Sequence, residues 1–254
     1  MKISHLFLPV VVLFTTFALG QTSGVIVYNE TLNLGVPVER QWTLYFDNKK
    51  SIYLETNSTK DDKKKDSNKD SNKIIIDLNV KEFYVASLNT RTLKSQGTVA
   101  TTPYLIEESI PKIKWELVKE SKTINSFDCQ KAKGNFRGRT YIAWFTKDIP
   151  SWCGPWKLFG LPGGILEFQD ETGQIKSSAI QVKINDNIDV DKIIDSNKGN
   201  GKSLSIKDYV ELKQRENELM LKYAMAKLGR EADIRSVEPY KRQGFELKYE
   251  WEEE

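Results

Sequence analysis

The sequence contains a single histidine, His5, so the chain from residue 21 onward has none. Histidine is the commonest general base at neutral pH and the commonest zinc ligand in proteins. Its absence argues against nucleophilic catalysis by a Ser/His or Cys/His pair and against a zinc site. No other recognisable catalytic or cofactor-binding motif takes its place. We therefore predict a protein that is not an enzyme and that uses no cofactor and no metal.

The longest apolar run, residues 6–19, is too short for a stable membrane span. It follows the basic Lys2, and Ala18 and Gly20 are the small residues just ahead of Gln21. A basic start, a short hydrophobic segment and small residues at the cut are typical of a secretory signal peptide. We predict cleavage after Gly20 and export, with an uncleaved membrane anchor as the alternative.

Cysteine is almost as scarce as histidine, with Cys129 and Cys153 the only two. An exported protein experiences oxidising conditions, which favour pairing of cysteines. A bridge would close a loop of about 25 residues and contribute roughly 3 kcal/mol by restricting the unfolded chain. We therefore predict a disulfide, with two free thiols as the alternative.

A dominant charge of one sign is also lacking, since the formal net charge is +3. Residues 60–73 concentrate charge without any apolar residue, but their six lysines are interleaved with four aspartates. Such a composition cannot bury enough surface to offset the entropy of ordering, so we predict a disordered loop. The aspartates and the absence of aromatic residues there argue against a nucleic-acid partner.

Short runs of β-branched and aromatic residues recur along the chain, separated by turn-forming residues. They predict strands over residues 24–28, 41–46, 51–55, 74–78, 83–85, 88–93, 104–106, 113–117, 139–145, 165–169 and 175–184. Polar turns at 47–50 and 170–173 fit hairpins. We predict a mainly β protein: a curved antiparallel sheet or partial barrel with one C-terminal helix, of the α+β class.

The character of the sequence changes after residue 184. Residues 185–205 are a polar linker, and residues 206–228 have the composition of a helix with Ser205 as its N-cap. The side chains available for a buried helix face are Ile206, Tyr209, Val210, Leu219, Met220, Tyr223 and Met225. In the tail, residues 229–254, the stretch 245–251 alternates apolar and charged residues, which predicts a strand that closes a sheet edge.

Residues 152–165 gather two tryptophans, two prolines, four glycines and one cysteine. We call this stretch the corner, because turn formers and large aromatics together predict a tight structural reversal. Leu161 to Gly164 fit a type II turn, with proline second and glycine third. The candidate turn residues are Gly160, Leu161, Pro162 and Gly163. The alternative is that Trp152, Trp156 and Phe159 contact a ligand or a partner.

Two arginines are further candidates for binding. Arg137 and Arg139 flank Gly138 at the start of a predicted strand, where alternation would put both on one face. They are candidates for an anionic ligand group, although pairing with Glu167 or Asp170 is the simpler interpretation. Trp144, within the same predicted strand, is an additional ligand or partner candidate.

The corner also carries a family resemblance. Residues 160–165 read Gly-Leu-Pro-Gly-Gly-Ile, and residues 154–157 read Gly-Pro-Trp-Lys. These motifs resemble the signature of the GLPGLI family of exported proteins from Gram-negative bacteria, which has no assigned biochemical role. Further similar segments lie at 44–46, 51–53, 129–132, 136–139 and 143–146. Gly164 stands where the family signature has its second leucine.

The resemblance implies a protein of the periplasm or the outer membrane, with at most a peripheral association with the membrane. The chain would divide into a signal peptide (1–20), a GLPGLI-like β domain (21–184), a linker (185–205), a helix (206–228) and a tail (229–254). We predict a non-enzymatic binding or accessory protein, with a hydrophobic small molecule as candidate ligand. The alternatives are docking on an outer-membrane protein or assembly, and a hydrolase that uses carboxylates alone.

Overall fold

The structure is a computed structural model, and it describes residues 23–58, 82–149, 152–184, 187–227 and 242–252. The predicted signal peptide, the predicted loop at 60–73 and the predicted strand at 74–78 lie outside these residues. Among the helices that are described, none has the length and apolar character needed to cross a membrane.

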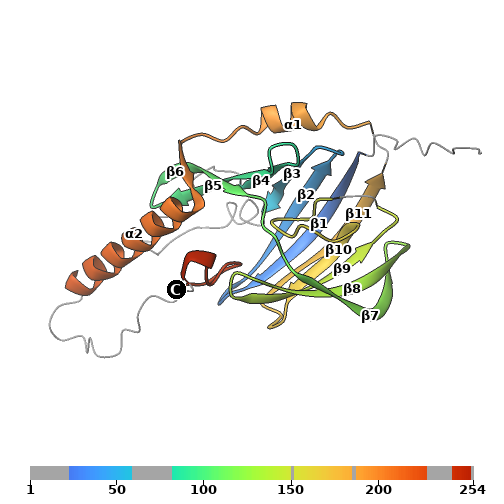
Figure 1. Cartoon of the computed structure of the whole chain (residues 1–254). Helices are drawn as coiled ribbons and strands as arrows, with labels where there is room; N and C mark the ends of the chain where they lie inside the picture. The colour runs from blue at the N-terminus through green and yellow to red at the C-terminus, as the bar shows by residue number, and fades with distance from the viewer. Residues whose placement is uncertain (1–22, 59–81, 150–151, 185–186, 228–241, 253–254) are drawn as a thin grey trace, which may run out of the picture.

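Twelve strands form one sheet that is open between its two edge strands, β7 and β12 (Figure 1). The strand order is β12-β6-β5-β4-β3-β2-β1-β11-β10-β9-β8-β7. The first six strands are β1 (Gly24–Asn33), β2 (Pro37–Phe46), β3 (Lys50–Ser58), β4 (Phe83–Ser87), β5 (Thr92–Val99) and β6 (Thr102–Ser109). The others are β7 (Trp115–Ile124), β8 (Phe127–Phe136), β9 (Arg139–Thr146), β10 (Gly164–Asp170), β11 (Ile175–Ile184) and β12 (Lys202–Ser205). The predicted mainly β fold is confirmed.

The strand β1 joins the two halves of the sheet. It pairs antiparallel with β2 on one side and with β11 on the other. Alternate β1 residues, among them Ile26, Tyr28 and Glu30, are buried on what we call the inner face of the sheet. All strand pairs are antiparallel except β12 with β6, which is parallel.

Two helices follow the sheet in sequence. The short α1 (Val190–Ser196) lies against β3, and α2 (Ile206–Lys227) packs on β12, β6 and β5. The predicted N-cap is confirmed, because the backbone N–H of Asp208 donates to Ser205 Oγ at 3.1 Å. Only the first turns of α2 contact the sheet, and the rest of the helix extends beyond it (Figure 1). For this reason the predicted buried face is wrong at Leu219, Met220 and Tyr223, which are exposed.

Other differences from the predicted elements have local causes. Residues 88–91 form the turn between β4 and β5 instead of part of a strand, with Arg91 in the left-handed region at φ 52°. The predicted linker at 185–205 contains α1 and β12. The predicted closing strand at 245–251 is absent from the described residues. There the backbone N–H groups of Leu247 and Lys248 both donate to Arg137 O, so they are not available to a strand partner.

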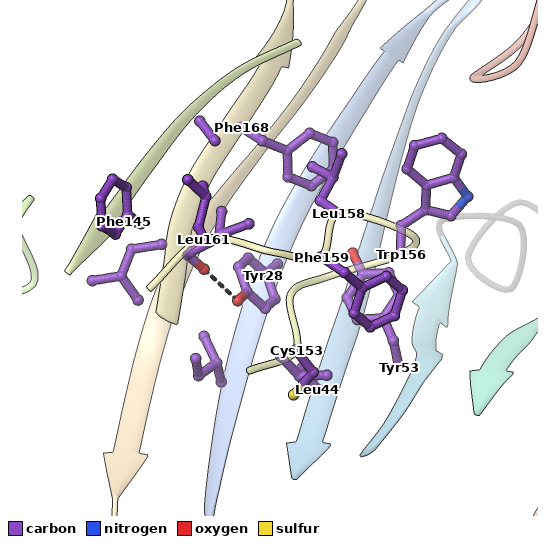
Figure 2. Close-up of a cluster of buried hydrophobic side chains, with 14 of the residues drawn as sticks. Tyr28, Leu44, Tyr53, Phe145, Cys153, Trp156, Leu158, Phe159, Leu161 and Phe168 are labelled. Carbon is purple, nitrogen blue, oxygen red and sulfur yellow. Dashed lines mark hydrogen bonds between the residues drawn. The ribbon is translucent and has the colours of Figure 1, made fainter. Parts of the chain in front are cut away.

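The main core lies between the inner face and the corner. Figure 2 shows corner side chains lying over Tyr28, Leu44 and Phe168 of the sheet. The corner residues in this core are Cys153, Trp156, Leu158, Phe159 and Leu161, all buried. Tyr28 Oη donates to Ile165 O at 2.6 Å, which ties the end of the corner to the centre of the sheet. The corner therefore fills one half of the inner face.

Candidate ligand-binding cavity

The half of the inner face that the corner leaves open borders a cavity of about 1210 Å³. Strands β1 to β6 form its floor, and α2 and the C-terminal residues 242–252 form its other walls. Its lining includes Glu30, Arg40, Trp42, Tyr53, Tyr84 and Trp156. This is the size of a small-molecule or oligomer binding site. We call it the inner cavity.

Aromatic side chains make up much of the floor. The rings of Trp42 and Tyr53 stack, with centroids 4.7 Å apart and planes 8° from parallel. Tyr84 lies directly opposite Tyr53 in the pairing of β3 with β4, and its ring centroid is 6.2 Å from that of Trp42. Because strand residues alternate between faces, single aromatic residues on β2, β3 and β4 meet as one surface.

A buried carboxyl group lies beside this aromatic floor. Glu30 is 2% exposed, and Trp42 Nε1 donates to its Oε1 at 3.1 Å. Burial raises the pKa of Glu30 to about 8, although Arg40 and the Trp42 hydrogen bond act to lower it. At neutral pH the group is mostly the neutral acid, which both donates and accepts hydrogen bonds.

Arg40 supplies a second polar group to the cavity. Its Nη1 is 3.4 Å from Glu82 Oε2, and its Nε is 3.9 Å from Glu55 Oε1. That longer separation is an ion pair without a hydrogen bond, so the buried Nε–H has no hydrogen-bond partner among the described residues. The Arg40 side chain as a whole is 20% exposed and lines the cavity, so its guanidinium group can donate to a ligand there even though Nε itself is buried.

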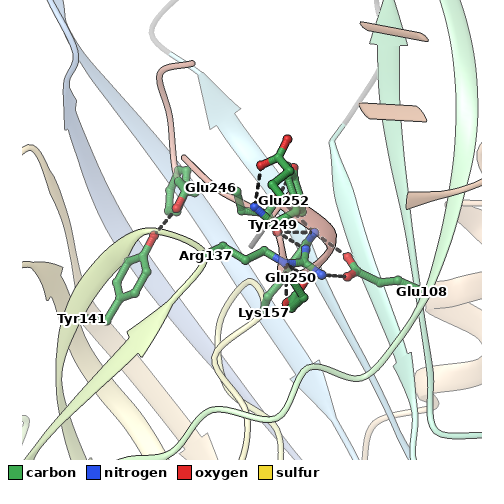
Figure 3. A network of polar contacts seen from close by, with 9 residues as sticks. Glu108, Arg137, Tyr141, Lys157, Glu246, Tyr249, Glu250 and Glu252 are labelled. Atoms are coloured by element: carbon green, nitrogen blue, oxygen red, sulfur yellow. Dashed lines mark hydrogen bonds and ion pairs between the residues drawn. The ribbon is translucent and has the colours of Figure 1, made fainter. Parts of the chain in front are cut away.

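A charged cluster (Figure 3) reaches the cavity through Lys157 and Glu246. It contains Glu108, Arg137, Lys157 and Glu246, whose side chains are all largely buried. Arg137 Nη2 donates to Glu108 Oε2 at 2.6 Å, and Lys157 Nζ donates to Glu246 Oε1 at 2.9 Å. Burial opposes ionisation of Glu246, but Lys157 and Arg137 outweigh it and lower the pKa of that carboxyl group.

The predicted ligand residues of the corner are separated by the fold. Trp156 is 3% exposed and borders the inner cavity, where its ring packs against Tyr141 and Phe245. Phe159 is buried in the core, and Trp152 is half-buried with its ring stacked on Phe159 at 6.1 Å. Trp152 Nε1 also donates to a backbone carbonyl at the β2–β3 turn. Of these three aromatics, only Trp156 contributes to the cavity.

The predicted arginine pair does not share a face. Arg137 and Gly138 are the two central residues of the β8–β9 turn, with φ of 44° and 82°. Arg139 begins β9, and its Nη1 donates to Asp170 Oδ2 at 2.7 Å, so the simpler interpretation holds for it. Arg137 pairs with neither Glu167 nor Asp170, because the turn directs it to the charged cluster.

Trp144 lies away from the inner cavity. It is half-buried on β9, and the Nζ of Lys122 is 4.4 Å from the centroid of its ring. This is the geometry of a cation–π contact at a surface. Trp144 is absent from the cavity lining.

The predicted type II turn is wrong in detail. Gly163 has φ 157°, far from the value near +80° that such a turn needs, and the backbone N–H of Gly164 donates to Ile149 O at 2.9 Å. Glycine is required at 163 for another reason: a Cβ there would lie 2.0 Å from Thr146 O. Two other corner residues lie at positive φ, Gly160 at 96° and Trp156 at 54°. The chain does reverse at the corner, but the conformation of Gly163 is set by its close approach to the backbone of Thr146 and not by a type II turn.

The predicted disulfide is also not present. Cys129 and Cys153 are both buried, and no disulfide joins them. Cys153 lies beside Leu44 of β2 (Figure 2), whereas Cys129 is on β8. Four strands separate β2 from β8 in the sheet, so the corner carries Cys153 away from the strand of Cys129.

The first comparison with known proteins is a family model. The model described as the N-terminal domain of the N-glycanase peptide matches residues 26–209 of this chain. The match spans well over half of the sequence. The chain belongs to this N-glycanase N-terminal domain family. The family match includes the sheet from the third residue of β1 to β12 and the start of α2, whereas residues 242–252 lie beyond it.

Solved structures of PNGF-II show the same fold. Two structures of PNGF-II, in space groups C2 and P21, are each 16% identical to this chain over 77% of it, with TM-scores of 0.52 and 0.53. They are covered to 33% and 34%, so this chain spans about a third of their length. An uncharacterized conserved protein from Thermus thermophilus is 10% identical, with a TM-score of 0.41, over 74% of this chain and 91% of that one. No curated protein matches this chain in sequence.

Apart from Trp156, sequence reasoning did not identify the residues of the cavity floor as ligand candidates. One signal was available for Glu30, which follows Ile26 and Tyr28 at intervals of two and so shares their buried face. A carboxyl group is unusual on the buried face of a strand whose other residues on that face are apolar. Arg40, Trp42 and Tyr53 gave no comparable signal, because their meeting depends on strand pairing.

Proposed function

We propose that this N-glycanase-family domain is a non-enzymatic binding module whose inner cavity holds a saccharide chain. The observation that carries the proposal is the aromatic floor of Trp42, Tyr53 and the half-buried Tyr84, with the neutral acid of Glu30 and the guanidinium of Arg40 beside it. We further propose, from the apolar amino terminus, that the protein is exported.

The chemistry of the cavity suits a sugar better than an acyl chain. A sugar ring presents C–H groups that pack on aromatic faces, and its hydroxyls both donate and accept hydrogen bonds. The acid of Glu30 and the guanidinium of Arg40 complement such hydroxyls. The family is named for an N-glycanase, so the glycan of a glycoprotein is the saccharide that we favour.

The predicted hydrophobic ligand is less well supported. Part of the inner face is already covered by the apolar side chains of Leu158, Phe159 and Leu161 of the corner. An acyl chain in the remaining cavity would cover Glu30 and Arg40 without offering them a hydrogen bond, which is costly. Docking through exposed corner tryptophans is not favoured either, because Trp156 is buried and the half-buried Trp152 is stacked on Phe159 and bonded to a backbone carbonyl.

A direct titration tests the proposal. The full chain is titrated by calorimetry with an N-glycan released from a glycoprotein, and separately with palmitate. We expect saturable binding of the glycan and none of palmitate. Arg40→Gln should weaken glycan binding roughly tenfold, since a hydrogen bond from a charged donor contributes about 1.5 kcal/mol.

The matched control is Trp144→Phe, which changes an aromatic residue on a sheet position outside the cavity and should leave glycan binding unchanged. Mass analysis of the glycan after incubation should show no cleavage. Binding of palmitate without the glycan, or equal loss in both variants, would show that the saccharide proposal is wrong. Cleavage of the glycan would show that the module is an enzyme.

A further inference from the structure

Residues 242–252, which we call the strap, lie beyond the family match and in no strand of the sheet. They nevertheless complete a wall of the inner cavity. The strap residues that line it are Arg242, Gln243, Gly244, Phe245, Glu246, Tyr249 and Glu252. The cavity of this protein is therefore closed by a segment that the family domain does not include.

The strap binds the family domain through its backbone at one place, the β8–β9 turn and the strand that follows it. The N–H groups of Leu247 and Lys248 donate to Arg137 O at 2.8 and 3.1 Å. Arg139 Nε donates to Gly244 O at 2.7 Å. These bonds leave the strap without a ladder to any strand, so its docking can be lost while the sheet pairing remains.

Side chains add two anchors nearby. The ring centroids of Phe245 and Trp156 are 4.7 Å apart. The backbone carbonyl oxygen of Phe245 accepts a hydrogen bond from Tyr141 Oη at 2.7 Å. Glu246 reaches between Arg137 and Lys157 and pairs with both (Figure 3). An aromatic residue followed by a carboxylate is thus bound by a Trp and Tyr surface next to two cations.

The charge balance makes Glu246 the decisive anchor. Without the strap, the buried Arg137 and Lys157 would share one carboxylate, that of Glu108. Glu246 supplies the second negative charge that this pair of cations requires. Removing one partner of a buried ionic cluster is strongly destabilising, because an unpaired charge remains out of water. Glu250 also contacts Arg137, but its side chain is 61% exposed and contributes little.

We propose that Arg137, Lys157, Tyr141 and Trp156 form a receptor for an acidic aromatic peptide segment, filled in cis by the strap, and that the docked strap closes the inner cavity over its ligand. The closing step rests on the proposed function. A ligand that contacts both the floor and the strap binds the closed form better, so occupancy of the cavity and docking of the strap stabilise each other.

Hydrogen exchange of the full chain, read by mass spectrometry, tests the receptor without any ligand. We expect Glu246→Gln to raise exchange in peptides covering 242–252 by roughly tenfold or more, while β1 and β11 keep their protection. The matched control, Glu250→Gln, removes a carboxylate from the same arginine and should change exchange less than about threefold. Unchanged protection of the strap in Glu246→Gln, or loss of protection in β1 together with it, would overturn the receptor.

The coupling is tested by adding a released N-glycan to the unmodified protein. We expect exchange within 242–252 to slow at saturating glycan, and Glu246→Gln to bind the glycan more weakly than Glu250→Gln does. If calorimetry detects glycan binding and the strap exchanges at the same rate, the coupling is wrong and the proposed function stands. If the glycan does not bind, the proposed function and the coupling fail together, whereas the variant comparison still decides the receptor.

Discussion

Replacing Glu30 by Gln isolates the free energy of burying one carboxyl group under the inner cavity. The pKa of Glu30 is raised from 4.5 to about 8, mainly by burial. Gln keeps a side-chain oxygen that can accept from Trp42 Nε1, but it cannot ionise. The variant therefore removes the ability of the site to ionise and leaves its shape and its hydrogen bond in place.

The sign of the pH dependence follows from proton binding. Between pH 4.5 and 8 the folded protein holds a proton on Glu30 that the unfolded chain has released, so the free energy of unfolding falls as pH rises. The pKa of Glu30 differs by about 3.5 between the folded and the unfolded chain. At about 1.36 kcal/mol for each pKa unit, this difference corresponds to roughly 5 kcal/mol of stability. This cost is fully present above pH 8 and absent below 4.5.

Urea unfolding followed by circular dichroism at about pH 5, 7 and 9 measures the effect. We expect Glu30→Gln to match the unmodified protein within about 1 kcal/mol near pH 5 and to exceed it by several kcal/mol near pH 9. Glu116→Gln, at an exposed position on β7, is the control and should show no such divergence. A difference between Glu30→Gln and the unmodified protein that stays constant with pH would refute the burial argument.

Three further predictions concern the corner, the cysteines and the amino terminus. Gly163→Ala should destabilise by roughly 3 kcal/mol or more, because its Cβ would overlap a backbone carbonyl. Gly35→Ala, also at positive φ but with no atom nearby, should cost only about 1 kcal/mol in thermal unfolding; equal losses would contradict the close-approach argument. In denaturant without reductant, alkylation should label both Cys129 and Cys153, and a mass with no added label would restore the disulfide. Amino-terminal sequencing of protein from the producing cell should begin after Gly20, and an intact Met1 would argue for an uncleaved anchor.

Much of the fold can be predicted because strand formation is signalled locally. The alternation of Ile26 and Tyr28 in β1 and the polar turn at 47–50 are legible from neighbouring residues alone. Helix α2 is predictable for the same reason, with its Ser205 cap. The exposure of the outer half of α2 is not predictable from the sequence. An apolar helix face is buried only where another element packs against it, and the sheet does not extend under this part of the helix.

The candidate site is predictable only in part. The composition of the corner predicts a structural reversal, and Trp156 does border the cavity. In the strap, Phe245, Leu247 and Tyr249 alternate with charged residues, which locally favours a strand. Arg137, a residue far away in sequence, overrides that local preference. Its carbonyl oxygen accepts the backbone hydrogen bonds of the strap, and its guanidinium group pairs with Glu246.

The sequence by itself determined the mainly β fold class, the position of most strands, the helix and the corner. Each of these depends on residues within a few positions of one another. Only the tertiary structure decided that the corner fills one half of the inner face, that the two cysteines stay apart, and that Glu30 and Arg40 share a cavity with Trp42 and Tyr53. The physical reason is that these outcomes depend on which strands pair and how the sheet curves. Both are set by the summed burial of many side chains, which no short stretch of sequence contains.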